Sequence, residues 1–296
     1  MTNLDKTYDL IVVGSGVTGA ELAQAYLGLG TDVTLISSRE LVLPGEDQDA
    51  AAVIEDVFRR RGMTVLNRSR MASAERRGDG VVVTLEDGRE VGGSHVLIAV
   101  GAVPNTRDIG LEEVGVELSD SGHIVTDRVS RTSARGVYAA GDCTGVNMLA
   151  SVAAMQGRIA VAHILGDTVH PLHTGEVASN IFTSPEIASV GISQSDVEAD
   201  PAMFTGMTMN LATNPRAKMR SLQHGFVKLF CRATSGRVIG GVIVAPTASE
   251  LILPIAMAVT NQLTVNQLAD SFAVYPSLSG TITEAARRLV AHDDLE

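Results

Sequence analysis

The sequence predicts an α/β fold, with a doubly wound parallel sheet in its first part and an α+β domain in its last part. Its 296 residues are enough for about two domains. With 29 glycines, 3% aromatic residues and no tryptophan, the core is expected to consist of small aliphatic side chains packed around glycine turns. Apolar runs and helical patterns alternate as β-α-β-α-β at the start, which is the repeating unit of a doubly wound sheet. After Thr174 the pattern changes to short strands separated by turn residues, which predicts the α+β domain.

The elements of the first part follow from the spacing of apolar residues. Continuous apolar runs predict buried strands at residues 10–13, 33–36 and 63–66, and helical spacing predicts helices at residues 20–29 and 49–61. Further strands are predicted at residues 81–85, 90–100 and 137–140, the first two joined by a turn at Asp87-Gly88, and a further helix at residues 148–165.

The last part is predicted to hold short strands and two closing helices. The strands lie at residues 181–182, around Val190, and at residues 207–211, 226–231 and 238–244. Capping-box patterns at Thr247 and Thr281 predict that the helices cover residues 251–262 and 285–292.

Charge and cysteine content exclude several classes of function. Since 34 acidic and 23 basic side chains leave a net charge of −11, the chain lacks the basic surface that nucleic-acid and membrane-surface proteins use. Cys143 and Cys231 are far apart, and the seven histidines have no ligand spacing, so neither a disulfide framework nor a metal site is expected. There is no signal-peptide pattern and no apolar segment of membrane-spanning length, so we expect a cytoplasmic protein without a membrane span.

A glycine-rich turn connects the first predicted strand to the first predicted helix. It reads Gly14, Ser15, Gly16, Val17, Thr18, Gly19. Glycines at this spacing permit a tight turn, a close approach to a pyrophosphate and close helix packing, while the helix amino terminus attracts phosphate charge. In its β-α-β-α-β context the pattern predicts a dinucleotide-binding site.

The end of the second predicted strand is expected to contact the adenine ribose of that dinucleotide. Ser37, Ser38 and Arg39 stand there. Two hydroxyl groups beside an arginine suit a 2′-phosphate better than a free 2′-hydroxyl, so NADPH is favoured over NADH. The alternative is that Arg39 is a solvated loop cation and that Glu40 binds the ribose of NADH.

Four segments together resemble a known enzyme family. They are residues 11–21 with the glycine turn, VLIAVGAVPN at 96–105, GVYAAGD at 136–142 and AVYPSLS at 273–279. In order and spacing they resemble the flavoprotein disulfide reductases, or pyridine nucleotide-disulfide oxidoreductases, and most closely the NAD(P)H:quinone reductases among them. The resemblance covers essentially the whole chain.

The resemblance implies three regions. Residues 1–103 correspond to an NAD(P)-binding domain, residues 104–170 to a returning segment of an FAD-binding domain, and residues 174–296 to a dimerisation domain that forms a homodimer. The expected fold is therefore a doubly wound nucleotide-binding domain, a partial flavin-domain segment and an α+β dimerisation domain.

The same resemblance assigns residues to two cofactors, FAD and NADP or NAD. For the nicotinamide nucleotide it adds Glu21, near the nicotinamide, and Val100 and Gly101, at a strand end beside the nucleotide. For FAD it assigns Gly141 and Asp142 at the ribityl chain, and the helix start Met148, Leu149, Ala150 facing the isoalloxazine.

The chain departs from the family pattern at both ends. It begins directly before the nicotinamide motif, so we expect the amino-terminal FAD half to be missing and the chain as given to be poorly active. Assigning the Gly14 motif to FAD instead is disfavoured, because no acidic residue stands at Ser37 and no cysteine precedes Cys143. Near the other end, where the family carries a His and a Glu, this chain has Tyr275 and Gly280.

These departures favour one function over two alternatives. Because the phenol of Tyr275 is a poor base at neutral pH, dithiol chemistry is disfavoured, and Tyr275 is the candidate catalytic residue for a thiol-independent reaction. The leading hypothesis is hydride transfer from NAD(P)H through FAD to a quinone-like acceptor. The alternatives are a dihydrolipoamide dehydrogenase-like enzyme and a non-catalytic nucleotide-binding dimerisation module.

Overall fold

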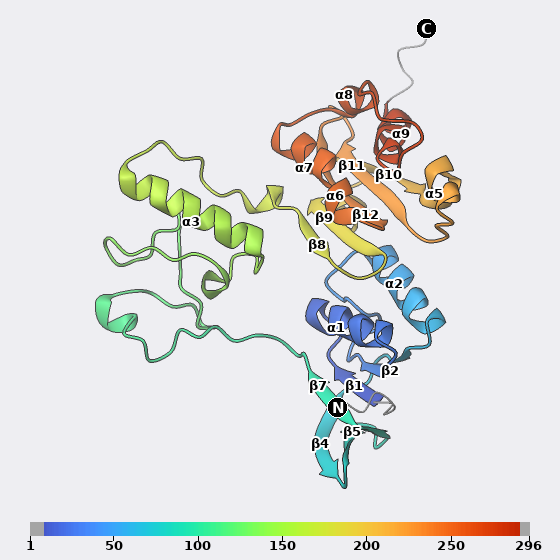
Figure 1. Cartoon of the computed structure of the whole chain (residues 1–296). Coiled ribbons are helices and arrows are strands. Elements are labelled where there is room, and N and C mark those ends of the chain that lie inside the picture. Colours follow the sequence, from blue (N-terminus) through green and yellow to red (C-terminus); the bar gives the residue numbers. More distant parts are fainter. Residues whose placement is uncertain (1–8, 291–296) are drawn as a thin grey trace, which may run out of the picture. The chain divides into compact units, whose positions relative to one another are not determined.

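The computed structural model describes residues 9–290 and divides the chain into two compact units (Figure 1). The first unit combines Met1–Gly101 with Asn180–Glu296, and the second unit is Ala102–Ser179. Residues 9–101 and 180–290 therefore fold together, and residues 102–179 form a unit of their own.

A four-stranded parallel sheet confirms the predicted doubly wound arrangement in the first unit. Its strand order is β3-β2-β1-β7, so the order reverses beside β1. The strands are β1 (Asp9–Val13), β2 (Asp32–Ile36), β3 (Thr64–Leu66) and β7 (His95–Ile98), and the connecting helices are α1 (Val17–Gly28) and α2 (Gln48–Arg60). Because ligands bind such sheets at the carboxyl ends of the strands where the order reverses, the end of β1 is the expected binding position.

Burial explains why these segments form strands and helices. Ile11 and Val12 in the central strand β1 are 1% and 0% exposed, since a parallel strand is covered on both faces. Helix α1 packs through Gly19, Ala20 and Ala23, whose small side chains allow a close approach to the sheet. Helix α2 begins at the N-cap Asp47, whose carboxylate accepts the N–H of Ala50 at 3.0 Å.

A small antiparallel sheet corrects the prediction of one strand over residues 90–100. This sheet consists of β4 (Met71–Arg77), β5 (Gly80–Leu85) and β6 (Glu90–Gly93). The chain leaves β6 at Gly93 and enters the parallel sheet as β7, because Ser94 donates its N–H to Asp9 O at 3.0 Å and so turns the backbone. Strand β4 was not predicted, since most of its side chains are exposed and polar.

The last part of the chain is the predicted α+β region. Its sheet has the order β10-β11-β12-β9-β8, and α7 and α9 pack against it, as Figure 1 shows. The strands are β8 (Ser179–Ile181), β9 (Glu186–Gly191), β10 (Phe204–Asn210), β11 (Phe226–Arg232) and β12 (Val238–Ala245). The helices are α4 (Gln194–Ala199), α5 (Pro215–Met219), α6 (Ala248–Leu251), α7 (Leu253–Thr260), α8 (Val265–Ala269) and α9 (Gly280–Leu289).

Both predicted capping boxes in this region are wrong. Thr247 has a left-handed backbone and makes no side-chain cap, and Ile252 separates α6 from α7, where Pro254 lacks an N–H donor. Thr281 lies inside α9, and its hydroxyl accepts a hydrogen bond from Asn214 Nδ2 at 2.8 Å. The predicted end of that helix at residue 292 lies outside the described residues. Capping boxes occur instead at Ser193 and Thr264, which open α4 and α8.

A buried ion pair joins the start of α2 to the five-stranded sheet of the α+β region, within the first unit. Lys228 on β11 is 1% exposed, and its Nζ lies 2.8 Å from the carboxylate of Asp47 and 2.6 Å from that of Asp49. One continuous apolar cluster also extends across both parts of the unit and includes Phe58 on α2 and Phe230 on β11. The parallel sheet with its helices and the α+β region therefore share one core.

The second unit contains little regular structure. Its main element is helix α3 (Ala150–Leu165), which confirms the prediction for residues 148–165 with a start two residues later. The prediction of a strand at residues 137–140 is wrong, because this segment pairs with its neighbour only through a single bridge between Arg131 and Tyr138. A small apolar cluster around Val116 and Ile124 supports the loops.

Replacing Lys228 tests the ion pair. Lys228→Met is expected to lower the free energy of unfolding by about 3–5 kcal/mol, because Asp47 would stay buried without a counter-charge. Urea unfolding followed by circular dichroism measures the loss. The matched control is Asp49→Asn, which removes a carboxylate that is 72% exposed and is expected to cost about 0–1 kcal/mol. Adding Asp47→Asn to Lys228→Met should recover part of the loss, since asparagine still caps α2. Equal losses for Lys228→Met and the control would contradict this role of the pair.

Candidate functional site

The glycine turn after β1 is held by contacts that exclude larger side chains. The N–H of Gly14 donates to Ile36 O at 3.0 Å. A Cβ on Gly14 would lie 2.1 Å from Ala99 O, after the end of β7, and a Cβ on Gly19 would lie 1.8 Å from Gly14 O. These two glycines are required because backbone packs against backbone at both positions.

The amino terminus of α1 presents free N–H groups. Its N-cap is Gly16, and no side chain in the described part of the chain caps it. The first intrahelical bond in this turn is donated by Ala20 to Gly16 O at 2.9 Å, so the N–H groups of Val17, Thr18 and Gly19 have no helical partner. Together with the helix dipole, these groups make the turn suitable for a pyrophosphate.

A cavity of about 380 Å³ lies beside this turn, a size typical of small-molecule sites. Its lining is Val13, Gly14, Ser15, Ile36, Ser38, Ser69, Arg70, Met71 and Val100. The structure thus brings together four residues that the sequence predicted: Gly14, Ser15, Ser38 and Val100. It adds the segment 69–71, which sequence reasoning missed because β4 was not recognised.

The predicted ribose-reading residues have different environments. Ser37 is fully buried, and its hydroxyl lies 2.7 Å from the hydroxyl of Ser15 and accepts the N–H of Arg39. The Ser37 hydroxyl therefore bonds within the protein, where it connects the glycine turn to the turn after β2. Ser38 and Arg39 are exposed, and only Ser38 lines the cavity. Glu40, the alternative ribose ligand, forms an ion pair with Arg68.

Glu21 connects α1 to the start of the α+β region. Its Oε1 accepts the N–H of Phe182 at 2.7 Å, and one turn later Gln24 Oε1 accepts the N–H of Ser184 at 2.8 Å. Nearby in the sequence, the side-chain amide of Asn180 is buried, and neither its nitrogen nor its oxygen has a partner among the described residues. In this structure Glu21 therefore positions the segment after β8.

The residues assigned to FAD lie in the second unit. Gly141 has φ +90°, and its N–H donates to Gln156 Oε1 at 2.7 Å, which fixes the turn. Asp142 and Met148 are exposed, and Leu149 is an N-cap without a side-chain bond, so the first N–H groups of α3, beginning with Ala150, have no cap from the described residues. A carboxylate next to free backbone donors suits the hydroxyl and carbonyl groups of a ribityl chain and flavin ring. The residues present therefore fit that end of FAD.

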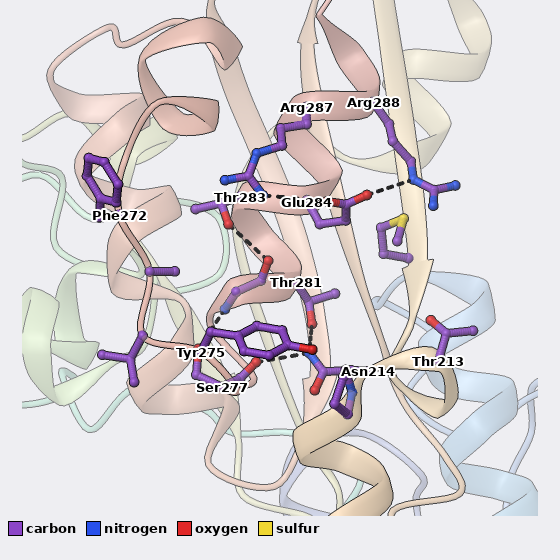
Figure 2. Close-up of a pocket in the computed structure, with 15 residues that line it drawn as sticks. Thr213, Asn214, Phe272, Tyr275, Ser277, Thr281, Thr283, Glu284, Arg287 and Arg288 are labelled. Atoms are coloured by element: carbon purple, nitrogen blue, oxygen red, sulfur yellow. Dashed lines mark hydrogen bonds and ion pairs between the residues drawn. The ribbon is translucent and has the colours of Figure 1, made fainter.

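Tyr275 lies at a second cavity, of about 450 Å³, in the α+β region. Figure 2 shows Tyr275, Ser277, Asn214 and Thr281 at one end of this cavity, and Glu284 with Arg287 and Arg288 at the other. Tyr275 is 82% exposed.

Gly101, the last residue predicted to bind the nicotinamide nucleotide, has φ +135° and ends the first segment of the first unit.

The two cysteines have different environments and form no disulfide. Cys231 on β11 is buried, and this burial raises the pKa of its thiol to about 11. Cys143 is half-buried in the second unit and donates its thiol to Ala140 O at 3.4 Å. Neither cysteine therefore has the thiol partner that dithiol chemistry requires.

Metal clusters and membrane-spanning helices are both absent from the part of the chain that the structure describes. No group of three or more His, Cys, Asp or Glu side chains among residues 9–290 is arranged to hold a metal ion. No helix in the same range is long and apolar enough to cross a bilayer.

Comparisons with known proteins agree with this geometry. A family model described as pyridine nucleotide-disulphide oxidoreductase matches residues 2–157, and the model of that family's dimerisation domain matches residues 177–286. NAD(P)H dehydrogenase (quinone) of Mycobacterium tuberculosis is 58% identical over 97% of this chain and 58% of its own length. Dihydrolipoyl dehydrogenase of Bacillus subtilis is 32% identical over 94% of this chain and 60% of its own length. A crystal structure of LpdA from Mycobacterium tuberculosis has a TM-score of 0.92 and 57% identity, over 98% of this chain and 63% of that one. The chain thus spans about three fifths of the length of these three relatives.

Substitutions in the glycine turn separate folding from binding. Gly19→Ala is expected to destabilise the protein by about 1–3 kcal/mol or more, because the added methyl group meets Gly14 O. Gly16→Ala is the matched control, since nothing lies within 4 Å of its Cβ position. It is expected to unfold like the wild type but to bind NADPH more weakly, because its methyl group would stand at the free helix end. Thermal unfolding and calorimetric NADPH titration measure the two effects, and a well-folded Gly19→Ala variant with normal affinity would show that the turn has been misassigned.

The thiols are expected to differ in reactivity. With a pKa of about 11, only about one Cys231 in ten thousand is a thiolate at pH 7, and the side chain is also buried. Iodoacetamide at pH 7 should therefore label Cys143 in the folded protein and Cys231 only after unfolding, as measured by peptide mass spectrometry. Cys143→Ala and Cys231→Ala are the paired controls. Labelling of Cys231 in the folded protein at the rate of Cys143 would contradict its burial.

Proposed function

Since the chain belongs to the pyridine nucleotide-disulphide oxidoreductase family, we propose that it provides the NAD(P)H-binding and dimerisation regions of a flavoprotein quinone reductase. The observation that carries this proposal is the cavity at the end of β1, which Gly14, Ser15 and Ser38 line, together with the uncapped start of α1 that follows the same glycine turn. The relative named NAD(P)H dehydrogenase (quinone) supports the choice of acceptor class.

Each region of the chain has a role in this proposal. Residues 1–103 bind NAD(P)H, residues 104–170 contribute to FAD binding, and residues 174–296 form the homodimer. In the first region the helix end at Gly16 holds the pyrophosphate, and Glu21 lies toward the nicotinamide.

The low cysteine content and the absence of a disulfide support a reducing compartment such as the cytoplasm.

FAD bound by the second unit would supply two-electron redox chemistry. Asp142 would hold the ribityl hydroxyl groups, and the free N–H groups at the start of α3 would face the ring. Among the described residues the glycine-rich helix start is already assigned to NAD(P)H. We therefore expect this chain to bind FAD weakly and to have low activity.

A thiol-independent reaction is favoured over lipoamide chemistry. Cys143 and Cys231 have no disulfide partner, and Tyr275 stands at a cavity rim, where its phenol would act as a hydrogen-bond donor toward an acceptor. The second candidate is a dihydrolipoamide dehydrogenase-like function, which the 32% identical relative favours. A non-catalytic nucleotide-binding dimer is the third.

One set of measurements on this chain distinguishes these functions. NADPH is expected to bind in calorimetry, the purified protein is expected to be colourless, and NADPH oxidation with a soluble quinone should be low and should increase with added FAD. Sedimentation should show a dimer at micromolar concentration. Turnover of dihydrolipoamide would favour the second candidate. Nucleotide binding and dimerisation without any flavin-dependent activity would favour the third, and a yellow protein with one FAD per chain would contradict the weak flavin site.

A further inference from the structure

We propose that Arg70 binds the 2′-phosphate of NADPH together with Ser38, with Arg39 as an outer cation. This inference rests on the proposed nucleotide site and adds to it a specificity-determining residue from the segment just before β4. It moves the main phosphate contact from the end of β2 to the residue directly before β4.

Backbone hydrogen bonds fix Arg70 beside the end of β2. The N–H of Ser69 donates to Ser37 O at 2.8 Å, and the N–H of Arg68 donates to Arg39 O at 2.9 Å. On its other side, Arg70 O accepts the N–H of Glu86 at 2.9 Å. The segment before β4 is therefore bonded to the turn after β2, and Arg70 and Ser38 line one cavity.

Arg70 is the arginine of this cavity lining whose charge is free to pair with a ligand. Its neighbour Arg68 is paired with Glu40, and Arg89 is paired with Asp87. The side chain of Arg70 has no acidic or polar partner among residues 9–290, and the cavity lining within these residues contains no acidic side chain. In a chain with a net charge of −11, an unpaired guanidinium at a cavity free of acids is a favourable position for a phosphate.

The hydroxyl groups around the cavity support the same assignment. Ser37 is buried and bonded to Ser15. Ser69 is occupied as well, because its Oγ donates to Asn67 O at 3.0 Å and accepts from Arg89 at 2.7 Å. The exposed Ser38 is the serine of this lining whose hydroxyl has no partner within the described residues, so it can donate to a phosphate oxygen beside Arg70.

Binding of two small probes tests the proposal without any flavin or turnover. The probes are adenosine 2′,5′-bisphosphate, which carries the 2′-phosphate, and 5′-AMP, which lacks it. Calorimetry on the full chain is expected to show that Arg70→Gln weakens the bisphosphate about tenfold to a hundredfold and leaves 5′-AMP unchanged, since one charge-assisted contact is lost. Arg70→Lys should retain part of the affinity, because it keeps the charge without the planar fork.

Arg76→Gln is the matched control. Arg76 is an exposed arginine on β4, the strand that follows Arg70, and lies outside the cavity lining, so its loss changes the net charge equally. It should leave both affinities unchanged, and all variants should unfold at the wild-type temperature because both side chains are exposed.

Every other result overturns the assignment of Arg70. Unchanged bisphosphate affinity in Arg70→Gln would make Arg70 a bystander, and equal loss of both probes would make it a general adenosine contact. Equal binding of the two probes by the wild type would show that no 2′-phosphate site exists there. If the wild type binds neither probe nor NADPH, the proposed nucleotide site itself fails, which distinguishes the two failures.

Discussion

The ion pair between Lys228 and Asp47 is the interaction on which the first unit depends. Asp47 is the N-cap of α2 and at the same time the buried counter-charge of a lysine on β11. A buried carboxylate and a buried ammonium are each costly alone, so the two parts of the unit must meet in the register that brings them together. This requirement fixes α2 against the five-stranded sheet that contains β11. Through the β2-α2-β3 connection, it also supports the sheet edge where the end of β2 meets the segment before β4.

The glycine turn applies the second constraint, at the carboxyl ends of the parallel strands. Gly14 and Gly19 bring the end of β1, the residue after β7 and the start of α1 within backbone contact. The buried contact between Ser15 and Ser37 then ties this turn to the end of β2. Three strand ends are thereby held in one rigid arrangement, and the cavity between them is formed before a ligand arrives. A preformed site of this kind keeps the ordering cost of binding low.

Much of this architecture could be predicted from sequence because its signals are local. The apolar runs of β1 and β2 and the G-x-G-x-x-G spacing each depend on neighbouring residues, and the structure contains them where they were expected. The errors arise where distant contacts decide. Thr281 has the sequence of a cap but bonds to Asn214, 67 residues away. Residues 137–140 look like a buried strand, yet they lack a neighbouring strand in the described chain.

In the candidate site, too, the residues of a local sequence motif could be predicted, whereas the residues placed by contacts between distant segments could not. The turn residues Gly14 and Gly16 are visible in the sequence, because the motif itself encodes their role. Ser37 and Ser38 are indistinguishable there, and only the tertiary structure separates a buried hydroxyl from an exposed one. Arg70 is one of several arginines near β4 and carries no motif. Its position at the cavity follows from hydrogen bonds between segments about 30 residues apart in sequence.

Electrostatics explains how an acidic chain can offer a site to an anionic nucleotide. With a net charge of −11, the average field of the protein repels phosphate at long range. At physiological salt, however, exposed charges are screened beyond about 8 Å, so the groups within that distance dominate. Arg70 is the charged side chain of the described cavity lining, which holds no acidic residue, and the free N–H groups of α1 follow in the adjoining turn. The neighbouring carboxylates of Glu40 and Asp87 are held by Arg68 and Arg89. With these acids paired locally, we expect a positive potential at the cavity where phosphates are proposed to bind, although the net charge of the protein is negative.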